Sequence, residues 1–399
     1  MTSLSALRQV TNPTFVGLLA ANTILGAALP MLIILGGLAG MLLAPTPALA
    51  TLPPSIQIFA GFLVTGPFSL LMGRRGRRVG FAVGGLSAMI GGGLGVLALL
   101  WSSFALLCLA HAFTGAALAC YLYFRFAAAE VVPAEWQPVA ISLMLTSGLV
   151  AAVIGPEVFV WTKDVFAPVP FAGAYAAIVL ITALGLVPLA LVDIPRPGHR
   201  DKHPRFDRAA LGAILRRRTV LTAVLVGAVS QGIMVLLMAP TPLAMTGHGH
   251  SEVLASDVVR WHVVAMFAPS FFTGFLIKRL GTVPIISTGL GLLIGSALLA
   301  ASGVSLHHFY AALIVLGMGW NFAFIGATDM LAGAVAPAER AAVQGANDTL
   351  IALASTICVF LSGAIVTGLG WAVLALSALP VLAATLIWVL VPRGRASGL

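Results

Sequence analysis

The longest polar stretch of this chain is "DIPRPGHRDKHPRFDRAALGAILRRR", residues 193–218. Proline, arginine and histidine dominate it, whereas the sequence on both sides is strongly apolar. Of the 399 residues 60% are hydrophobic and only 8% are charged, a balance that no soluble domain has. The stretch therefore predicts a linker over 194–218 that joins two membrane-embedded halves, 1–193 and 219–399.

Twelve apolar runs flank this linker, six on each side. Each run approaches the ~20 residues that a helix needs to cross the hydrocarbon of a bilayer. Because a backbone exposed to lipid must satisfy its own hydrogen bonds, the spans are predicted to be helices. An all-α membrane protein is thus expected, with spans near 15–42, 54–72, 79–100, 104–128, 138–161, 171–193, 219–244, 256–277, 282–303, 309–333, 341–366 and 371–391.

Positive charge predicts the orientation of these spans, since cytoplasmic loops are enriched in lysine and arginine. With the N-terminus in the cytoplasm, nineteen of the 21 basic residues fall on the inner side, eight of them within 196–218. Only Lys163 and Arg260 are left outside. Both termini and the linker are therefore predicted to be cytoplasmic, and the basic balance requires no nucleic-acid partner.

The two halves resemble copies of each other. "VPAEW" at 132–136 corresponds to "APAER" at 336–340, an offset of 204 residues. "GRRGRR" at 73–78, after the second span, corresponds to "KRLG" at 278–281, after the eighth. A constant offset of about half the chain indicates parallel six-helix repeats.

This organisation resembles the major facilitator superfamily over the whole chain. The signature of that superfamily between its second and third spans has the form G-x-x-x-D-R-x-G-R-R, and here the segment 69–78 reads "SLLMGRRGRR". The matching residues are Arg74, Gly76, Arg77 and Arg78. Ser69 and Gly73 replace the signature's glycine and aspartate, which puts in question the usual charge lock at that corner. The resemblance implies a transporter whose halves rock around a midplane site.

Ionisable residues inside predicted spans are functional candidates by default. Here they are Arg125, Glu157, Asp329 and Asp348. Arg125 and Asp329 are 204 residues apart, so they occupy matching repeat positions and are predicted to form a gate that closes the cytoplasmic side. The alternative is that both sit at the membrane–water boundary. The segment "GLVAAVIGPEV", 148–158, resembles part of a span-five motif of proton-coupled exporters, and a helix-bending Gly-Pro explains it equally well.

Soft side chains recur at a spacing of four in two neighbouring spans. "QGIMVLLMAP", 231–240, contains Met234 and Met238, and "RWHVVAMFAP", 260–269, contains His262 and Met266. Residues four apart share one face of a helix. If spans seven and eight form an antiparallel hairpin, Met234 lies at the depth of Met266 and Met238 at that of His262.

Three thioethers and one imidazole suit Cu(I) far better than ions that prefer oxygen. Methionines that merely fill gaps, and a hydrogen-bonded core histidine, are the alternative. The pair of motifs resembles that of the CcoA-type copper importers of the superfamily. The resemblance implies copper import across the bacterial cytoplasmic membrane, which supplies assembly of the cbb3-type cytochrome c oxidase.

Several further expectations accompany copper import. Met245, His248 and His250, between spans seven and eight, are candidates for capturing copper at the outer surface. Copper is expected as the transported substrate of a monomeric protein in the lipid bilayer, with a cytoplasmic copper chaperone as recipient, no cofactor and no enzymatic activity. Asn22 and Asn321 are expected to bond across helices.

Two other functions stay open at this point. One is a proton-coupled drug or metabolite exporter, in which Glu157, Asp329 or Asp348 carries the proton. The other is a membrane copper sensor that binds the ion without moving it.

Overall fold

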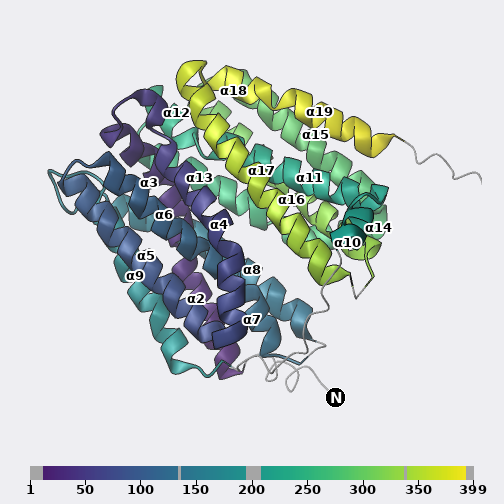
Figure 1. The fold of residues 1–399 in the computed structure, drawn as a ribbon. Coiled ribbons are helices and arrows are strands. Elements are labelled where there is room, and N and C mark those ends of the chain that lie inside the picture. Colours follow the sequence, from purple (N-terminus) through teal and green to yellow (C-terminus); the bar gives the residue numbers. More distant parts are fainter. Residues whose placement is uncertain (1–11, 134–135, 195–207, 337–338, 392–399) are drawn as a thin grey trace, which may run out of the picture.

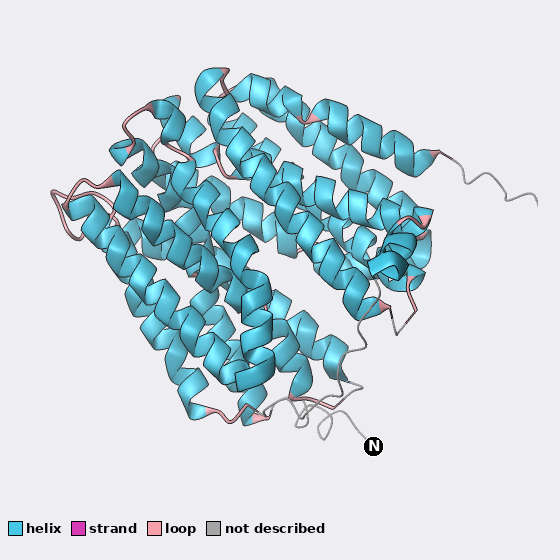
Figure 2. Ribbon diagram, in the orientation of Figure 1, coloured by secondary structure: helices cyan, strands magenta, loops and turns pink. Residues whose placement is uncertain are grey.

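The computed structural model describes residues 12–133, 136–194, 208–336 and 339–391, and these residues form helices joined by short turns (Figures 1 and 2). In that part of the chain, eleven helical stretches are long and apolar enough to cross a membrane. Helix α8 supplies the twelfth, its apolar stretch being Thr146–Thr162. The all-α architecture with twelve spans is therefore confirmed.

The N-terminal half contains six spans, three of which are made of two helical pieces. Their bounds are α2 (Pro13–Gly26), α3 (Ala28–Leu43), η1 (Pro47–Leu49), α4 (Leu52–Arg75), α5 (Arg77–Leu100), α6 (Phe104–Tyr121), α7 (Phe124–Glu130), α8 (Gln137–Thr162) and α9 (Ala172–Leu191).

The C-terminal half also contains six spans, which follow a short additional helix. Its elements are α10 (Arg208–Leu215), α11 (Arg218–Met238), α12 (Thr241–Gly247), α13 (Glu252–Phe267), α14 (Ser270–Leu280), α15 (Thr282–Ala301), α16 (Leu306–Ala334), α17 (Arg340–Gly368), α18 (Trp371–Ser377) and α19 (Leu379–Leu390).

The turns at Gly76 and Gly281 show the repeat at the level of the backbone. Gly76 joins α4 to α5 with φ 91° and ψ 160°, and Gly281 joins α14 to α15 with φ 89° and ψ 161°. Residues with a Cβ rarely adopt this conformation, so both halves need glycine here. At the first turn Arg77 forms an ion pair with Glu130, 2.7 Å away.

Two spans of the C-terminal half break beside the methionine motifs. Helix α11 ends at Met238 and α12 begins after Pro240. Helix α13 ends at Phe267 and α14 begins after Pro269. Because proline has no amide hydrogen and its ring clashes with the preceding turn, it interrupts a helix at these points.

The two halves contact each other mainly on the side that the charge pattern predicts to be external. There α13 packs against α8 and α3, α12 against α3, and α17 against α4. The hydroxyl of Ser55 at the start of α4 lies 3.3 Å from the carbonyl oxygen of Val359 in α17. In Figure 1 the halves meet near α3 and α12 and diverge toward α7 and α10. The side that is predicted to be external is therefore closed in this structure.

Candidate functional site

The four residues of the predicted copper site are all buried. Met234 and Met238 are 4% and 8% exposed in the last turns of α11, and Met266 is 8% exposed near the end of α13. His262 is fully buried one turn before Met266. The three methionines belong to one apolar cluster, to which α16 also contributes. In this state no one of the four is open to water.

The hydrogen bonds of His262 determine which ring nitrogen is available. Its Nδ1 lies 2.7 Å from the carbonyl oxygen of Leu313 in α16. A carbonyl only accepts hydrogen bonds, so Nδ1 carries the hydrogen, and in the neutral ring Nε2 keeps a free lone pair. Among the described residues, this Nε2 has no hydrogen-bond partner although it is buried. A buried acceptor without a partner costs free energy, and a metal ligand is one role that explains its position.

One face of α16 holds the segment from His262 to Met266. Leu313, Gly317 and Asn321 follow one another at intervals of four, on one side of the helix. A Cβ at Gly317 would lie 2.6 Å from the carbonyl oxygen of His262 and 2.9 Å from the amide nitrogen of Met266, so only glycine allows this approach. The Nδ2 of Asn321 donates to the carbonyl of Met266 at 2.7 Å, beside the helix break. The expected bonding of Asn321 across helices is confirmed.

Spans seven and eight contact each other through α12 and α13, but the predicted packing of α11 against α13 is wrong. Helices α11 and α13 make at most marginal direct contact, whereas α16 packs closely against both. Gly317 allows the backbone of α16 to lie directly against α13. That Met234 and Met266 share one depth, and Met238 and His262 another, stays a prediction.

The predicted outer capture group is not assembled as expected. Met245 is fully buried in α12 and belongs to the same apolar cluster as the other methionines, so it is not an exposed loop residue. Nδ1 of His248 bonds to the carbonyl of Ala244 at 2.7 Å, and Nε2 of His250 bonds to that of Val304 at 2.8 Å. Within the described residues, no three His, Cys, Asp or Glu side chains gather closely enough to hold a metal ion.

The predicted cytoplasmic gate pair is apart in this state. Asp329 accepts a hydrogen bond from the hydroxyl of Thr282 at 2.7 Å. The guanidinium of Arg125 lies over the ring of Phe126, 4.8 Å from its centroid, and its charge acts on the carboxylate of Asp348. Because the halves diverge on the predicted cytoplasmic side, a gate between Arg125 and Asp329 stays a prediction for the opposite state.

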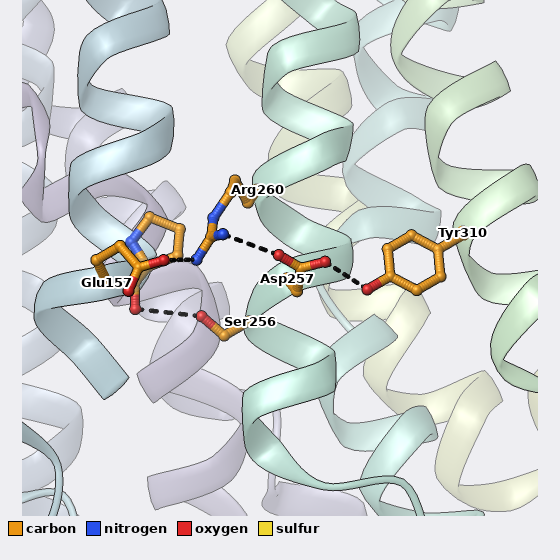
Figure 3. A network of polar contacts seen from close by, with 6 residues as sticks. Glu157, Ser256, Asp257, Arg260 and Tyr310 are labelled. Atoms are coloured by element: carbon orange, nitrogen blue, oxygen red, sulfur yellow. Dashed lines mark hydrogen bonds and ion pairs between the residues drawn. The ribbon is translucent and has the colours of Figure 1, made fainter. Parts of the chain in front are cut away.

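Glu157 belongs to a network that links the two halves at the external side (Figure 3). Its carboxylate forms an ion pair with Arg260 of α13, whose guanidinium also contacts Asp257 at 3.0 Å. The hydroxyl of Tyr310 in α16 donates to the same aspartate. Sequence reasoning missed Asp257 and Tyr310, although Arg260 was marked as one of only two basic residues on the outer side.

The second outer basic residue also bridges the halves. Nζ of Lys163, directly after α8, lies 2.7 Å from a carboxylate oxygen of Asp164 and 3.1 Å from one of Glu252 at the start of α13. Partial burial alone would lower the pKa of Lys163, but its hydrogen bonds to these two carboxylates outweigh burial and raise that pKa above its usual range.

An aromatic cluster that the sequence did not reveal lies beside the methionines. Trp320 stacks on Phe324 with ring centroids 4.9 Å apart, and Phe267 meets Trp320 edge to face. The indole of Trp320 donates to the side-chain oxygen of Gln231 in α11 at 2.7 Å. Since these side chains are half-buried and Phe267 reaches Gly148 of the other half, the cluster faces the region between the halves.

Twelve apolar helices in two similar halves, with broken spans beside buried thioether and imidazole side chains, are typical of a membrane transporter. No family model matches the chain. It is 37% identical over 378 residues to the riboflavin transporter RfnT of Brucella anthropi, and the match covers 94% of this chain and 95% of that relative. It is 32% identical over 369 residues to the uncharacterized MFS-type transporter YdeG of Bacillus subtilis, covering 88% and 85%. The chain belongs to the major facilitator superfamily of transporters.

Solved structures show the same fold. The nucleoside transporter NupG superposes with a TM-score of 0.68 at 14% identity, over 94% of this chain and 98% of that one. FucP in its outward conformation gives a TM-score of 0.61 at 17% identity, over 96% and 98%. None of the proteins named here is named for copper.

Proposed function

We propose that this transporter imports copper, with Met234, Met238, His262 and Met266 as its ligands. The observation that carries the proposal is the buried Nε2 of His262, which keeps its lone pair and has no partner among the described residues. Three buried thioethers belong to the two spans concerned. Thioether and imidazole ligands select Cu(I) over ions that prefer oxygen.

The breaks in the helices support the same site. In transporters, discontinuous spans mark the substrate site, because interrupted helices free backbone groups there and allow the segments to move. Here α11 breaks directly after Met238, and α13 breaks just after Met266. Because the four ligands are neutral when His262 is uncharged, they leave the charge of the ion uncompensated, which favours transient binding during transport.

Uptake of labelled copper into cells tests the proposal. Each of Met234, Met238 and Met266 is replaced by leucine, a change that removes the sulfur but should cost less than ~1.5 kcal/mol of folding free energy. Uptake should fall sharply while the protein level in the membrane stays near normal. Met318→Leu is the matched control, because Met318 is half-buried on α16 and outside the apolar cluster of the other methionines.

The same assay separates the alternatives. A proton-coupled exporter would lower the copper content of cells or leave it unchanged, and a sensor would bind copper without changing it. If all three leucine variants import copper at the parental rate, the methionines only fill space and the proposal fails.

A second candidate cargo is a planar aromatic metabolite such as riboflavin. The relative named for riboflavin, at 37% identity over almost the whole chain, supports it, and so does the half-buried cluster of Phe267, Trp320 and Phe324. Aromatic rings stack on planar ligands, and Gln231 offers an amide for hydrogen bonds to a polar edge. Uptake of labelled riboflavin beside labelled copper, in the same cells, decides between the two.

We also propose the cellular location and the partners of the transporter. Both termini and the 194–218 linker face the cytoplasm of a bacterium, and the chain acts as a monomer in the inner membrane. Copper passes to a cytoplasmic chaperone and then to the cbb3-type cytochrome c oxidase. Membership of a transporter family supports the expectation that the chain carries out no enzymatic reaction.

A further inference from the structure

Two cations at the external side share one arrangement, although they come from different halves. Lys163 of the N-terminal half contacts Asp164 of its own half and Glu252 of the other half. Arg260 of the C-terminal half contacts Asp257 of its own half and Glu157 of the other. We call Lys163 and Arg260 the bridging cations.

We propose that the bridging cations form an exchange latch. Each cation is held between one carboxylate of its own half and one of the other half, and it loses only the carboxylate of the other half when the external side opens. Among the described residues, the contacts that cross between the halves beside these cations include the two ion pairs and the hydrogen bond from Ser256 to the carbonyl of Pro156, at 3.4 Å. Opening the external side must break all three.

The own-half carboxylates reduce the cost of that opening. The side chains of Lys163 and Arg260 are only 16% and 21% exposed, so either cation stripped of every carboxylate would lose most of its stabilisation. Asp164 and Asp257 remain attached to their cations, and Tyr310 holds Asp257 in place from α16. The two states thus differ by about one partly exposed ion pair at each cation, rather than by an unpaired charge.

The exchange latch is also connected, through contacts of α16, to the site that contains the proposed ligands. This connection does not depend on which cargo the site binds. Tyr310, which contacts Asp257, precedes Leu313 by one turn of α16, and Leu313 holds His262. Asp257, Arg260 and His262 lie within two turns of α13. When the latch opens, α13 and α16 therefore move together as a unit away from α8.

The proposal makes an unusual prediction, because loss of the two kinds of carboxylate has opposite effects. Glu157→Gln and Glu252→Gln remove a contact made only in the closed state, so each should raise the ratio of externally open to closed molecules by about fivefold, as expected for one partly exposed pair. Asp257→Asn and Asp164→Asn remove the partner that each cation keeps on opening, so each should lower this ratio.

Distances between spin labels measure the ratio directly. The labels are placed at Val165 and Leu369, which are 63% and 66% exposed at the external ends of the two halves, in the full chain with Cys108, Cys120 and Cys358 replaced. The ionic strength is chosen so that the unsubstituted chain populates both the short and the long distance.

Each pair of variants contains its own control, because both changes remove one carboxylate from the same cation. Opposite shifts for Glu157→Gln and Asp257→Asn, and again for Glu252→Gln and Asp164→Asn, support the exchange latch. Shifts of the same sign within a pair, or no shift in either pair, overturn it. Should Glu157→Gln or Asp257→Asn prevent folding, the Lys163 pair decides alone, because Asp164 is 66% exposed and its loss spares the core.

Discussion

Gly317→Ala adds one methyl group where α16 meets α13. Its Cβ would lie 2.6 Å from the carbonyl oxygen of His262, 2.9 Å from the amide nitrogen of Met266 and 3.0 Å from the Cβ of Ala265. Ordinary contact begins at 3.4 Å, so the helices must separate by about 0.8 Å at this point. Two of the three atoms are backbone and cannot rotate away. Overpacking of this kind costs ~1–3 kcal/mol, of which the better helix propensity of alanine offsets up to ~1 kcal/mol.

The change should affect transport more than folding. A separation of 0.8 Å stretches both contacts that position the ligand segment, namely His262 to Leu313 and Met266 to Asn321. If the chain imports copper as proposed, uptake should fall about tenfold or more, since a misplacement of ~1 Å in a site commonly costs more than that. Gly333→Ala on the same helix is the control, because a Cβ there meets nothing within 4 Å. If Gly317→Ala melts no lower than Gly333→Ala and imports copper at the parental rate, α16 does not position the site.

Three further outcomes can be checked at the cytoplasmic side. Reporter fusions that are active only outside the cytoplasm should be silent at Leu399 and in the 194–218 linker, and activity at Leu399 would break the twelve-span topology. Asp329→Asn should increase the cytoplasmic accessibility of introduced cysteines in the outward-facing state, and unchanged accessibility and transport would exclude the gate with Arg125. The hydrogen bonds from Arg217 hold the pKa of Glu339 below its usual value, so this ion pair persists at neutral pH and is lost as the pH falls through the lowered pKa. Arg217→Gln should return the pKa of Glu339 toward its ordinary value when the carboxylate is titrated by NMR.

The fold was predictable because a bilayer allows few solutions. Apolar runs of spanning length must be helices, and the offset between 132–136 and 336–340 revealed the repeat without any contact information. The correspondence of Gly76 and Gly281 extends to nearly equal backbone angles. These features depend on composition and on local conformation, which a single sequence contains.

The packing of the candidate site was less predictable, because it depends on which helix lies between two others. The spacing of Met234 and Met238, or of His262 and Met266, fixes a face but not the neighbour of that face. The close approach of α16 requires a residue without a side chain at Gly317, and glycine is too frequent in this chain for that position to stand out. For the bridging cations the sequence identified the residues but not their partners. The count of basic residues singled out Lys163 and Arg260 on the predicted outer side, but it gave no indication of which carboxylates they contact.

The choice of cargo rests on neighbouring residues, since one fold supports many functions and a relative at 37% identity fixes the family alone. Met266 and Phe267 are consecutive on α13, so their side chains point about 100° apart, toward the buried cluster and toward Trp320 respectively. For a copper importer, Met266→Leu should abolish uptake of labelled copper while Phe267→Leu leaves most of it. For a transporter of a planar aromatic metabolite, the order reverses with labelled riboflavin, because leucine keeps the volume of methionine but removes the ring on which such a ligand stacks. The two variants differ by one position on one helix, so general damage to α13 would lower uptake of the transported cargo equally in both. An equal loss in Met266→Leu and Phe267→Leu would therefore refute both assignments.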